Sequence, residues 1–167
     1  MSRGRIFLLG VSDMLDADEI APRIWQGSKP PLGQLVAQEG FDTLVLCARE
    51  YQPASVYFPG VQVVHAPNDD APEIYPFTEE NLKTAVRASG LAAQAVEKDH
   101  RVLVTCAAGI NRSGLVVALM LHRLYGLSGS SCIQLVRRRR KSLREGQPKP
   151  LSNELFVKAL ERLPFRV

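Results

Sequence analysis

The stretch from Val102 to Ser113, VLVTCAAGINRS, constrains this chain more than any other. It opens with a short aliphatic run at 102–104, which favours a buried strand, and then reaches Cys106. Small residues lead on to Arg112, and the next segment, 114–125, is apolar on nearly all faces and predicts a central helix. The chain therefore places a cysteine at the end of a buried strand, followed by a tight loop and a helix N-terminus.

Such a loop is suited to binding an anion, because its backbone N–H groups can turn inward ahead of the helix. Gly109 permits a positive φ, and Arg112 offers a planar fork of donors that holds two phosphate oxygens at once. The same positive field favours a thiolate at Cys106, and Ser113 is placed to hydrogen-bond the sulfur. The sequence predicts a phosphate-binding cup with a nucleophile beneath it, lined by Ala107, Ala108, Gly109, Ile110, Asn111 and Arg112.

The motif from Cys106 to Ser113 resembles the C-x5-R-[ST] signature of the cysteine-dependent protein tyrosine phosphatases, and its context is most similar to the dual-specificity family. The resemblance covers roughly residues 20–163. It includes the opening segment Ile24 to Ser28 and the spacing of Asn153, Phe156 and Leu160 in the last helix. It implies a phosphomonoester hydrolase that acts on phosphorylated protein through a phosphocysteine intermediate, with no metal and no other cofactor.

One residue departs from the family pattern. The dual-specificity branch usually has histidine before the nucleophile, and this histidine helps to order the loop through hydrogen bonds. Here the residue is Thr105. This departure is the one motive for an alternative, in which the fold binds phosphorylated partners with little turnover.

The resemblance also implies a carboxylic acid that protonates the departing oxygen and later activates water. It comes from a loop after the strand at 61–65, where Asn68-Asp69 aligns best and Asp70 is the second candidate. The alternative for either residue is a loop carboxylate that only makes turn hydrogen bonds. Ser113 would help the thiolate to leave in the second step.

Cys47 lies in Leu46 to Glu50, a stretch that resembles the phosphoinositide-phosphatase branch of the superfamily. A cysteine at this position there can form a disulfide with the nucleophile, which implies a reversible Cys47–Cys106 disulfide. The alternative is an ordinary core thiol, which is also the interpretation for Cys132. The three histidines have no metal-ligand spacing and are interpreted as structural: His65, His100 and His122.

Substrate classes follow in order of support. Phosphotyrosine together with phosphoserine or phosphothreonine comes first, from the closest resemblance. A phosphoinositide is second, although the cup lacks lysines for extra phosphates. An RNA 5′-phosphate is third, because Asn111 directly before the arginine also occurs in RNA-phosphatase relatives. A sulfurtransferase is disfavoured, because Ser113 and a separate acid loop are not part of that chemistry.

Residues 137–149 carry seven basic residues and one acid. They are either a solvated helix face and loop, with the arginines outward, or a patch that attracts an acidic partner such as a phosphopeptide, a membrane lipid or RNA. No aromatic residues interleave with the arginines, which weakens a single-stranded nucleic-acid interpretation, and we expect no DNA partner.

The 167 residues predict one domain, 1–167, and no run of eighteen apolar residues predicts a transmembrane helix. No signal peptide is evident. Three widely spaced cysteines and a thiolate nucleophile fit a reducing, cytoplasmic setting. The sequence does not determine the oligomeric state.

Strands alternating with helices predict an α/β fold with a mostly parallel central sheet of about four to five strands flanked by helices, as in phosphotyrosine phosphatases. Ligands of such sheets bind beyond the carboxyl ends of the strands. Residues 13–19 are expected to form a polar turn or short helix, and Ser152 to cap the last helix. The expected strands lie at 5–11, 20–31, 41–47, 61–65 and 102–106, and the expected helices at 33–39, from 78, 114–125, from 128 or 130, and 153–163.

Overall fold

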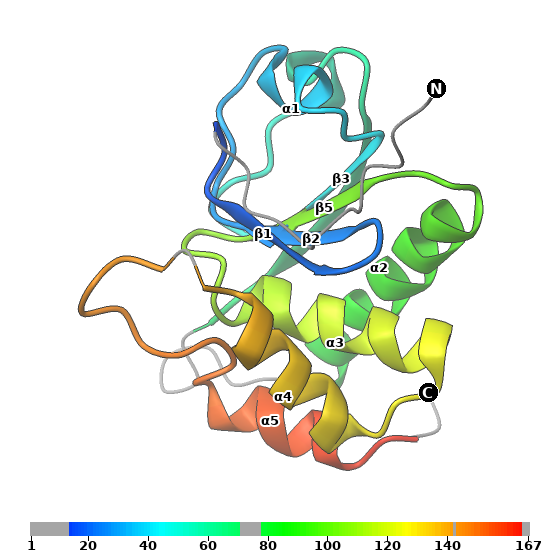
Figure 1. Cartoon of the computed structure of the whole chain (residues 1–167), viewed down its shortest axis with the longest axis vertical. Helices are drawn as coiled ribbons and strands as arrows, with labels where there is room; N and C mark the ends of the chain where they lie inside the picture. The colour runs from blue at the N-terminus through cyan, green and yellow to red at the C-terminus, as the bar shows by residue number, and fades with distance from the viewer. Residues whose placement is uncertain (1–13, 71–77, 142, 165–167) are drawn as a thin grey trace, which may run out of the picture.

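A five-stranded sheet forms the centre of the computed structural model, which describes residues 14–70, 78–141 and 143–164 (Figure 1). The strand order is β1-β2-β5-β3-β4, and every neighbouring pair is parallel except the antiparallel β1–β2 pair. The predicted fold class is confirmed. The strands are β1 (Ala17–Ala21), β2 (Ile24–Gly27), β3 (Thr43–Ala48), β4 (Gln62–Asn68) and β5 (Val102–Thr105).

Helices cover both faces of the sheet. One face packs on α2, α3 and α4, with α5 against α3 and α4, and the other face packs on α1 (Figure 1). The helices are α1 (Leu35–Gln38), α2 (Glu79–Glu97), α3 (Arg112–Tyr125), α4 (Gly129–Arg139) and α5 (Glu154–Glu161), with a short 3-10 turn η1 (Ser55–Tyr57). None of them, within the ranges just given, has the length and apolar character needed to cross a bilayer.

Two apolar clusters arise from the two-residue period of the strands. Ile24, Val45 and Val104 point to the face with four helices, whereas Trp25 and Leu103 point to the α1 face. Successive side chains of a strand point to opposite faces, so strands buried on both sides are continuously apolar. This explains why the sequence runs at 41–47 and 102–104 predict strands correctly.

Helix α3 is the most buried helix, as the sequence predicts, because residues 112–121 are all buried. It ends at Gly126, whose φ of 66° is the left-handed conformation that terminates helices. Thr78 caps α2 and Ser128 caps α4, both as expected. The last helix differs: the Asn153 side chain accepts from the Leu155 N–H, so Asn153, and not Ser152, is the N-cap.

The expectation of a polar turn or helix at 13–19 is wrong. Ala17–Ala21 form β1, which pairs with β2 through a turn that contains Arg23 at φ 67°. The polar pair Asp18-Glu19 does not fit the apolar pattern of a buried strand. Asp18 is nevertheless buried, because it forms an ion pair with Arg140, 122 residues away. The strand expected at 5–11 lies outside the described residues.

The register brings the loops after three strands to one edge of the sheet. Thr105 at the end of β5 pairs with Gly27 on β2 and with Leu46 on β3. Asn68, at the end of β4, pairs with Ala48. The segments after these residues contain Cys106, Glu50, Asp69 and Asp70, so the candidate catalytic side chains share the carboxyl edge.

Candidate active site

The loop that joins β5 to α3, residues 106–111, is held from outside by its carbonyl groups. Four consecutive carbonyls accept hydrogen bonds from other elements of the fold. Their donors are Lys29 N to Ala107 O at 3.3 Å, Arg140 Nη2 to Ala108 O at 3.3 Å, Gln26 Nε2 and Arg140 Nε to Gly109 O at 3.0 Å each, and Leu151 N to Ile110 O at 2.9 Å.

These outward carbonyls determine where the N–H groups point. In a planar trans peptide, the C=O of one residue and the N–H of the next point in opposite directions. The N–H groups of residues 108–111 therefore point to the opposite, concave side of the loop. Within the described part of the chain, no backbone carbonyl accepts from them. The sequence analysis predicts a phosphate cup at these residues, and backbone N–H groups without a backbone acceptor are what such a cup requires.

Gly109 is required at the tightest point of this loop. Its φ is 68°, which non-glycine residues rarely adopt. A Cβ there would lie 2.7 Å from the Gly27 carbonyl oxygen and 2.6 Å from Arg140 Nη2. Both the backbone conformation and the close approach of β2 and Arg140 exclude a side chain.

Cys106 and Ser113 contact each other as the sequence predicts. The Cys106 Sγ and Ser113 Oγ atoms are 3.3 Å apart, and both residues are buried. Gln26 Nε2 also donates to Ser113 Oγ at 3.3 Å, which leaves the hydroxyl hydrogen free to point at the sulfur. Gln26 is a site residue that the sequence analysis missed, although a glutamine in a buried strand is itself a signal.

Arg112 enters the site from the first turn of α3, and its side chain is only 8% exposed. Its Nη1 and Nη2 atoms donate to the two Glu50 carboxylate oxygens at 2.6 and 2.7 Å, and Nη1 also donates to Asn68 O at 2.9 Å. Its buried Nε has no partner among the described residues. A buried guanidinium edge without a partner, beside a row of inward amides, is suited to an oxyanion.

The charges of this pair support each other. The hydrogen bonds from Arg112 lower the pKa of Glu50 to about 2. Burial alone would lower the pKa of Arg112, but its bonds to Glu50 and the nearby charges of Cys106, Glu50 and Asp70 raise it above its ordinary value. Arg112 is therefore a permanent cation close to the Cys106 sulfur. Glu50 was not predicted as a site residue, because nothing local distinguishes it from any loop acid.

The two candidate acids have different partners. Both carboxylate oxygens of Asp69 accept from Arg49 Nε, at 3.0 and 2.9 Å. Asp70 accepts from the cup residue Asn111 at 3.1 Å and from Asn153, the cap of α5, at 2.9 Å. Asp70 is thus bonded to the cup itself, whereas Asp69 lies beside the cup and is held by Arg49.

Thr105 and Cys47 lie on neighbouring strands behind the cup. Thr105 Oγ1 donates to Val45 O at 3.1 Å, so this residue ties β5 to β3 and makes no bond to the loop. Cys47 follows Leu46, the register partner of Thr105, and is therefore next to Cys106 across the sheet. Burial, followed by the nearby Cys106 charge, raises the pKa of the Cys47 thiol well above its ordinary value. All three cysteines are unpaired and buried.

The basic segment 137–149 is only partly a surface, so the expectation that its arginines point outward is wrong in part. Arg140 is fully buried, and Arg137 donates to the carbonyls of Pro150 and Leu151. Its exposed basic residues are Arg138, Lys141, Arg144 and Lys149. The sequence analysis could not tell which of the four consecutive arginines at 137–140 is buried, because they lie at the end of an amphipathic helix.

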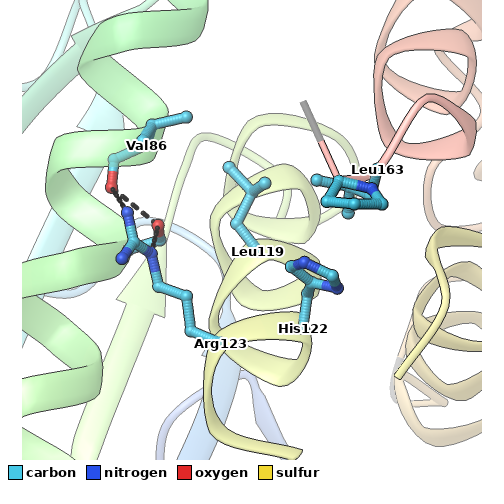
Figure 2. Close-up of a pocket in the computed structure, with 7 residues that line it drawn as sticks. Val86, Leu119, His122, Arg123 and Leu163 are labelled. Carbon is cyan, nitrogen blue, oxygen red and sulfur yellow. Dashed lines mark hydrogen bonds between the residues drawn. The ribbon is translucent and has the colours of Figure 1, made fainter. Parts of the chain in front are cut away.

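A cavity next to the cup, of about 650 Å³, is lined by Asp70, Asn111, Asn153 and residues at the start of α5. A different cavity, of about 410 Å³, lies between α2, α3 and the C-terminal segment (Figure 2). In that cavity Arg123 donates to Ser89 Oγ and Val86 O, and His122 contacts Leu127 O. Its polar groups bind the protein's own atoms, so the cup is the better candidate site for an anion.

The other histidines also bind local oxygen atoms. His65 Nε2 is 2.8 Å from Pro53 O, and His100 Nδ1 is 3.0 Å from Thr43 Oγ1. Over residues 14–70, 78–141 and 143–164, no group of three or more potential ligand side chains is placed to hold a metal ion.

Comparison with known proteins gives one family and one fold. The sequence model of the family described as "Dual specificity phosphatase, catalytic domain" matches residues 24–151. Comparison with curated protein sequences gave no match.

Solved structures of the same fold cover nearly the whole chain. Tk-PTP in its active form has a TM-score of 0.67 and 26% identity, covering 87% of this chain and 96% of its own. A mouse putative dual specificity phosphatase, complexed with zinc tungstate, has a TM-score of 0.67 and 25% identity over 92% of each chain. Human DUSP28 has a TM-score of 0.68 and 24% identity over 91% and 97%.

We predict that the Glu50–Arg112 pair gives this protein an acid-sensitive part of its stability. The pKa of Glu50 is about 2 in the folded protein against 4.5 unfolded, so its contribution is complete above pH 4.5 and is lost as the pH falls towards 2. The difference in free energy of unfolding between the parent protein and Glu50→Gln, measured with urea, should be constant from pH 5 to 7 and shrink below pH 4.5. Glu145→Gln, at an exposed loop position, is the control; a constant difference down to pH 2.5 would contradict the pairing.

Proposed function

Since the chain belongs to the dual specificity phosphatase family and carries its catalytic domain, we propose that it hydrolyses phosphate monoesters of proteins, at tyrosine and at serine or threonine, through a phosphocysteine intermediate. The observation that carries this proposal is the combination of inward amides at 108–111, the unpartnered Arg112 Nε and the Cys106 sulfur at one strand end. The mouse relative is complexed with zinc tungstate, and tungstate is a tetrahedral oxyanion like phosphate, so tungstate serves below as the probe for oxyanion binding.

In the first step, the Cys106 thiolate attacks phosphorus in line with the departing oxygen. The S–P bond forms as the P–O bond breaks, and a carboxylic acid gives its proton to the leaving oxygen. The cup amides and Arg112 hold the three equatorial oxygens, where negative charge must be stabilised. These donors are fixed by the fold before the substrate arrives, so little reorganisation accompanies the reaction.

In the second step, water attacks the phosphocysteine. The carboxylate accepts a proton from this water as the S–P bond breaks, and orthophosphate leaves. Ser113 donates its hydroxyl hydrogen to the departing sulfur, consistent with the 3.3 Å contact. The cycle regenerates the thiolate and the protonated acid, and it needs no metal or other cofactor.

Asp69 is the acid that we propose, and Arg49 has to release it. The Arg49 side chain is 54% exposed, so its pair with Asp69 is solvated and weak. Asp70, by contrast, is bonded to Asn111 and Asn153, so rotation towards the substrate would disrupt the cup. The pairing favours Asp69 as the movable carboxyl and Asp70 as a fixed support.

Protein substrates are favoured over two alternatives on this scaffold. A phosphoinositide is suggested by the stretch around Cys47, but the side chains at 107–111 offer no lysine to further phosphates. An RNA 5′-phosphate is suggested only by Asn111, which in this structure has its own partners, Asp70 and the Asn153 N–H. A panel of phosphotyrosine and phosphothreonine peptides, a short-chain phosphoinositide and a 5′-phosphorylated oligoribonucleotide distinguishes these classes.

We propose that the exposed cations of residues 137–149 bind an acidic partner. Of the partners considered, we favour the phosphorylated protein substrate. Arg138, Lys141, Arg144 and Lys149 are exposed. Burial alone would raise the pKa of the nearby Asp16, but its bonds to Arg140 and Ser28, and the charges of Arg140 and Arg144, lower it below its ordinary value. Since Arg140 also contacts the cup, this surface adjoins the site. We propose that the reaction takes place in the reducing cytoplasm, where the Cys106 sulfur is not oxidised.

We predict that Cys106→Ser abolishes hydrolysis of para-nitrophenyl phosphate, with a loss of at least about a thousandfold in kcat/KM, because the covalent step requires the thiolate. Tungstate binding, measured by calorimetry, should persist because the amides and Arg112 remain. Cys132→Ser, another buried thiol, is the control. Hydrolysis that survives in Cys106→Ser would exclude the mechanism, and a parent protein that binds tungstate without releasing phosphate would be a binding module.

We predict that Asp69→Asn slows hydrolysis of alkyl and phenyl phosphates by about a hundredfold, the usual contribution of a general acid. It should slow para-nitrophenyl phosphate much less, because that leaving group departs without a proton. The acidic limb of the pH–rate profile is compared for the two substrates. Asp70→Asn is the matched control: if it shows the leaving-group dependence instead, the acid is Asp70.

We further propose that peroxide oxidises Cys106 to a sulfenic acid. The Cys47 sulfur then attacks the Cys106 sulfur, so that the S–S bond forms as the S–O bond breaks and water leaves. Burial makes Cys47 a poor first target, so oxidation begins at Cys106. Mild peroxide should give a 47–106 crosslinked peptide and an activity loss that dithiothreitol reverses. Cys47→Ser should become irreversibly oxidised and Cys132→Ser should behave as the parent; sulfinic acid without a crosslink in the parent would rule out the disulfide.

A further inference from the structure

Arg140 is the one arginine of the basic segment whose side chain is entirely buried. It follows the last turn of α4, at its C-cap, and reaches inward between the β1–β2 hairpin and the cup. Such a buried guanidinium is costly unless carboxylates and hydrogen-bond acceptors surround it. The hydrogen-bond partners of the Arg140 guanidinium therefore indicate its role.

One edge of the Arg140 guanidinium binds the cup. Nε donates to Gly109 O at 3.0 Å and Nη2 donates to Ala108 O at 3.3 Å. These are the two carbonyls at the back of the tightest turn, and one of them belongs to the glycine that no other residue can replace. Arg140 thus contacts the outer surface of the anion site without facing the anion.

The other edge binds two carboxylates at the start of the described chain. Nη1 donates to Asp16 Oδ1 at 3.0 Å and to Asp18 Oδ2 at 3.1 Å, and Nη2 donates to Asp16 Oδ2 at 3.0 Å. Asp18 is 3% exposed and also accepts from the Lys141 N–H at 2.8 Å. These bonds fix the guanidinium plane, so that its direction towards the loop is set by the fold.

We infer that Arg140 is a positioning residue of the phosphate cup, which holds the Ala108 and Gly109 carbonyls outward and so directs the N–H groups of Gly109 and Ile110 at the bound anion. This role rests on the proposed phosphatase function. It also accounts for a cup that is closed although Thr105 makes no bond to the loop. A cation on the carbonyl side polarises these two peptides, which increases the partial positive charge of the N–H groups on the other side.

The test uses Arg140→Lys in the full chain. Lysine keeps a cation next to Asp16 and Asp18, but one ammonium group cannot reach two carboxylates and two carbonyls at fixed angles. We expect tungstate affinity and kcat/KM for para-nitrophenyl phosphate to fall by about thirtyfold or more. We also expect kcat itself to fall, and not only KM to rise, because amides that turn away from the anion no longer stabilise the charge on the equatorial oxygens in the transition state.

Arg162→Lys is the matched control, since this exposed arginine is the C-cap residue of α5, as Arg140 is of α4. Asp16→Asn is the second variant, should Arg140→Lys fail to fold. Asp16 is 41% exposed, so its loss loosens Arg140 without an unpaired buried charge, and the same changes should appear in weaker form. Thermal unfolding of each variant is recorded alongside.

Variants that unfold at lower temperature but keep the parent's tungstate affinity and kcat would overturn the inference, because a merely structural ion pair predicts that result. The proposed function fails separately. If the parent protein binds tungstate but hydrolyses no substrate of the panel, while Arg140→Lys weakens tungstate binding, the positioning role stands and the phosphatase proposal does not.

Discussion

Four carbonyl groups held from outside determine the chemistry of this molecule. Each of Ala107, Ala108, Gly109 and Ile110 has its oxygen bound by a donor from outside the loop, and Arg140 binds two of them. Because each peptide is planar, the N–H groups point the other way. The inward donors therefore exist before any ligand arrives. A loop that had to arrange four amides around a phosphate on binding would lose that ordering entropy from its affinity. In this protein the loop is ordered on folding, by bonds from the β1–β2 hairpin and the residues after it, from the end of α4 and from the segment before α5.

The same arrangement explains why charged residues that never face the substrate are buried around the site. In the proposed mechanism Arg112 is the cation at the phosphate. Glu50 holds two of the Arg112 nitrogens, and the Arg112 Nε has no partner within the described residues. Arg140 supplies a second cation on the carbonyl side, balanced by Asp16 and Asp18. Each guanidinium is fixed by carboxylates on the edge that does not do the binding. This is how a small domain orients a long, flexible side chain to a definite direction.

Sequence analysis succeeded where local pattern and burial agree. The apolar runs at 41–47 and 102–104 became β3 and β5, and the cysteine, arginine and serine of one contiguous motif lie together. It failed where a polar residue is buried by a distant partner. From the sequence alone, Asp18 is typical of a turn, and Arg140 is one of four consecutive arginines expected to face solvent. In the structure these two residues form a buried ion pair. Glu50 likewise acquires its role only through Arg112, 62 residues away. Ion pairs across such separations leave no periodic trace in a sequence.

The two carboxylates of the loop after β4 are held with different firmness. In the proposed mechanism, this difference decides which of them can move to the substrate. Asp70 is bonded to Asn111, which is itself tied to the Asn153 N–H, so one end of the loop is fixed to the cup and to the cap of α5. Among the side chains that the structure describes, the Asp69 carboxylate is bound by the exposed Arg49 alone. A carboxyl that is to carry a proton must be able to leave its cationic partner, and a solvated pair costs little to break. In the proposed mechanism, the substrate's phosphate brings two negative charges to a site whose cations include Arg112 and Arg140 as well as Arg49, the partner of Asp69. An approaching dianion would then compete with Asp69 for Arg49, which favours release of the proposed acid as the leaving oxygen arrives.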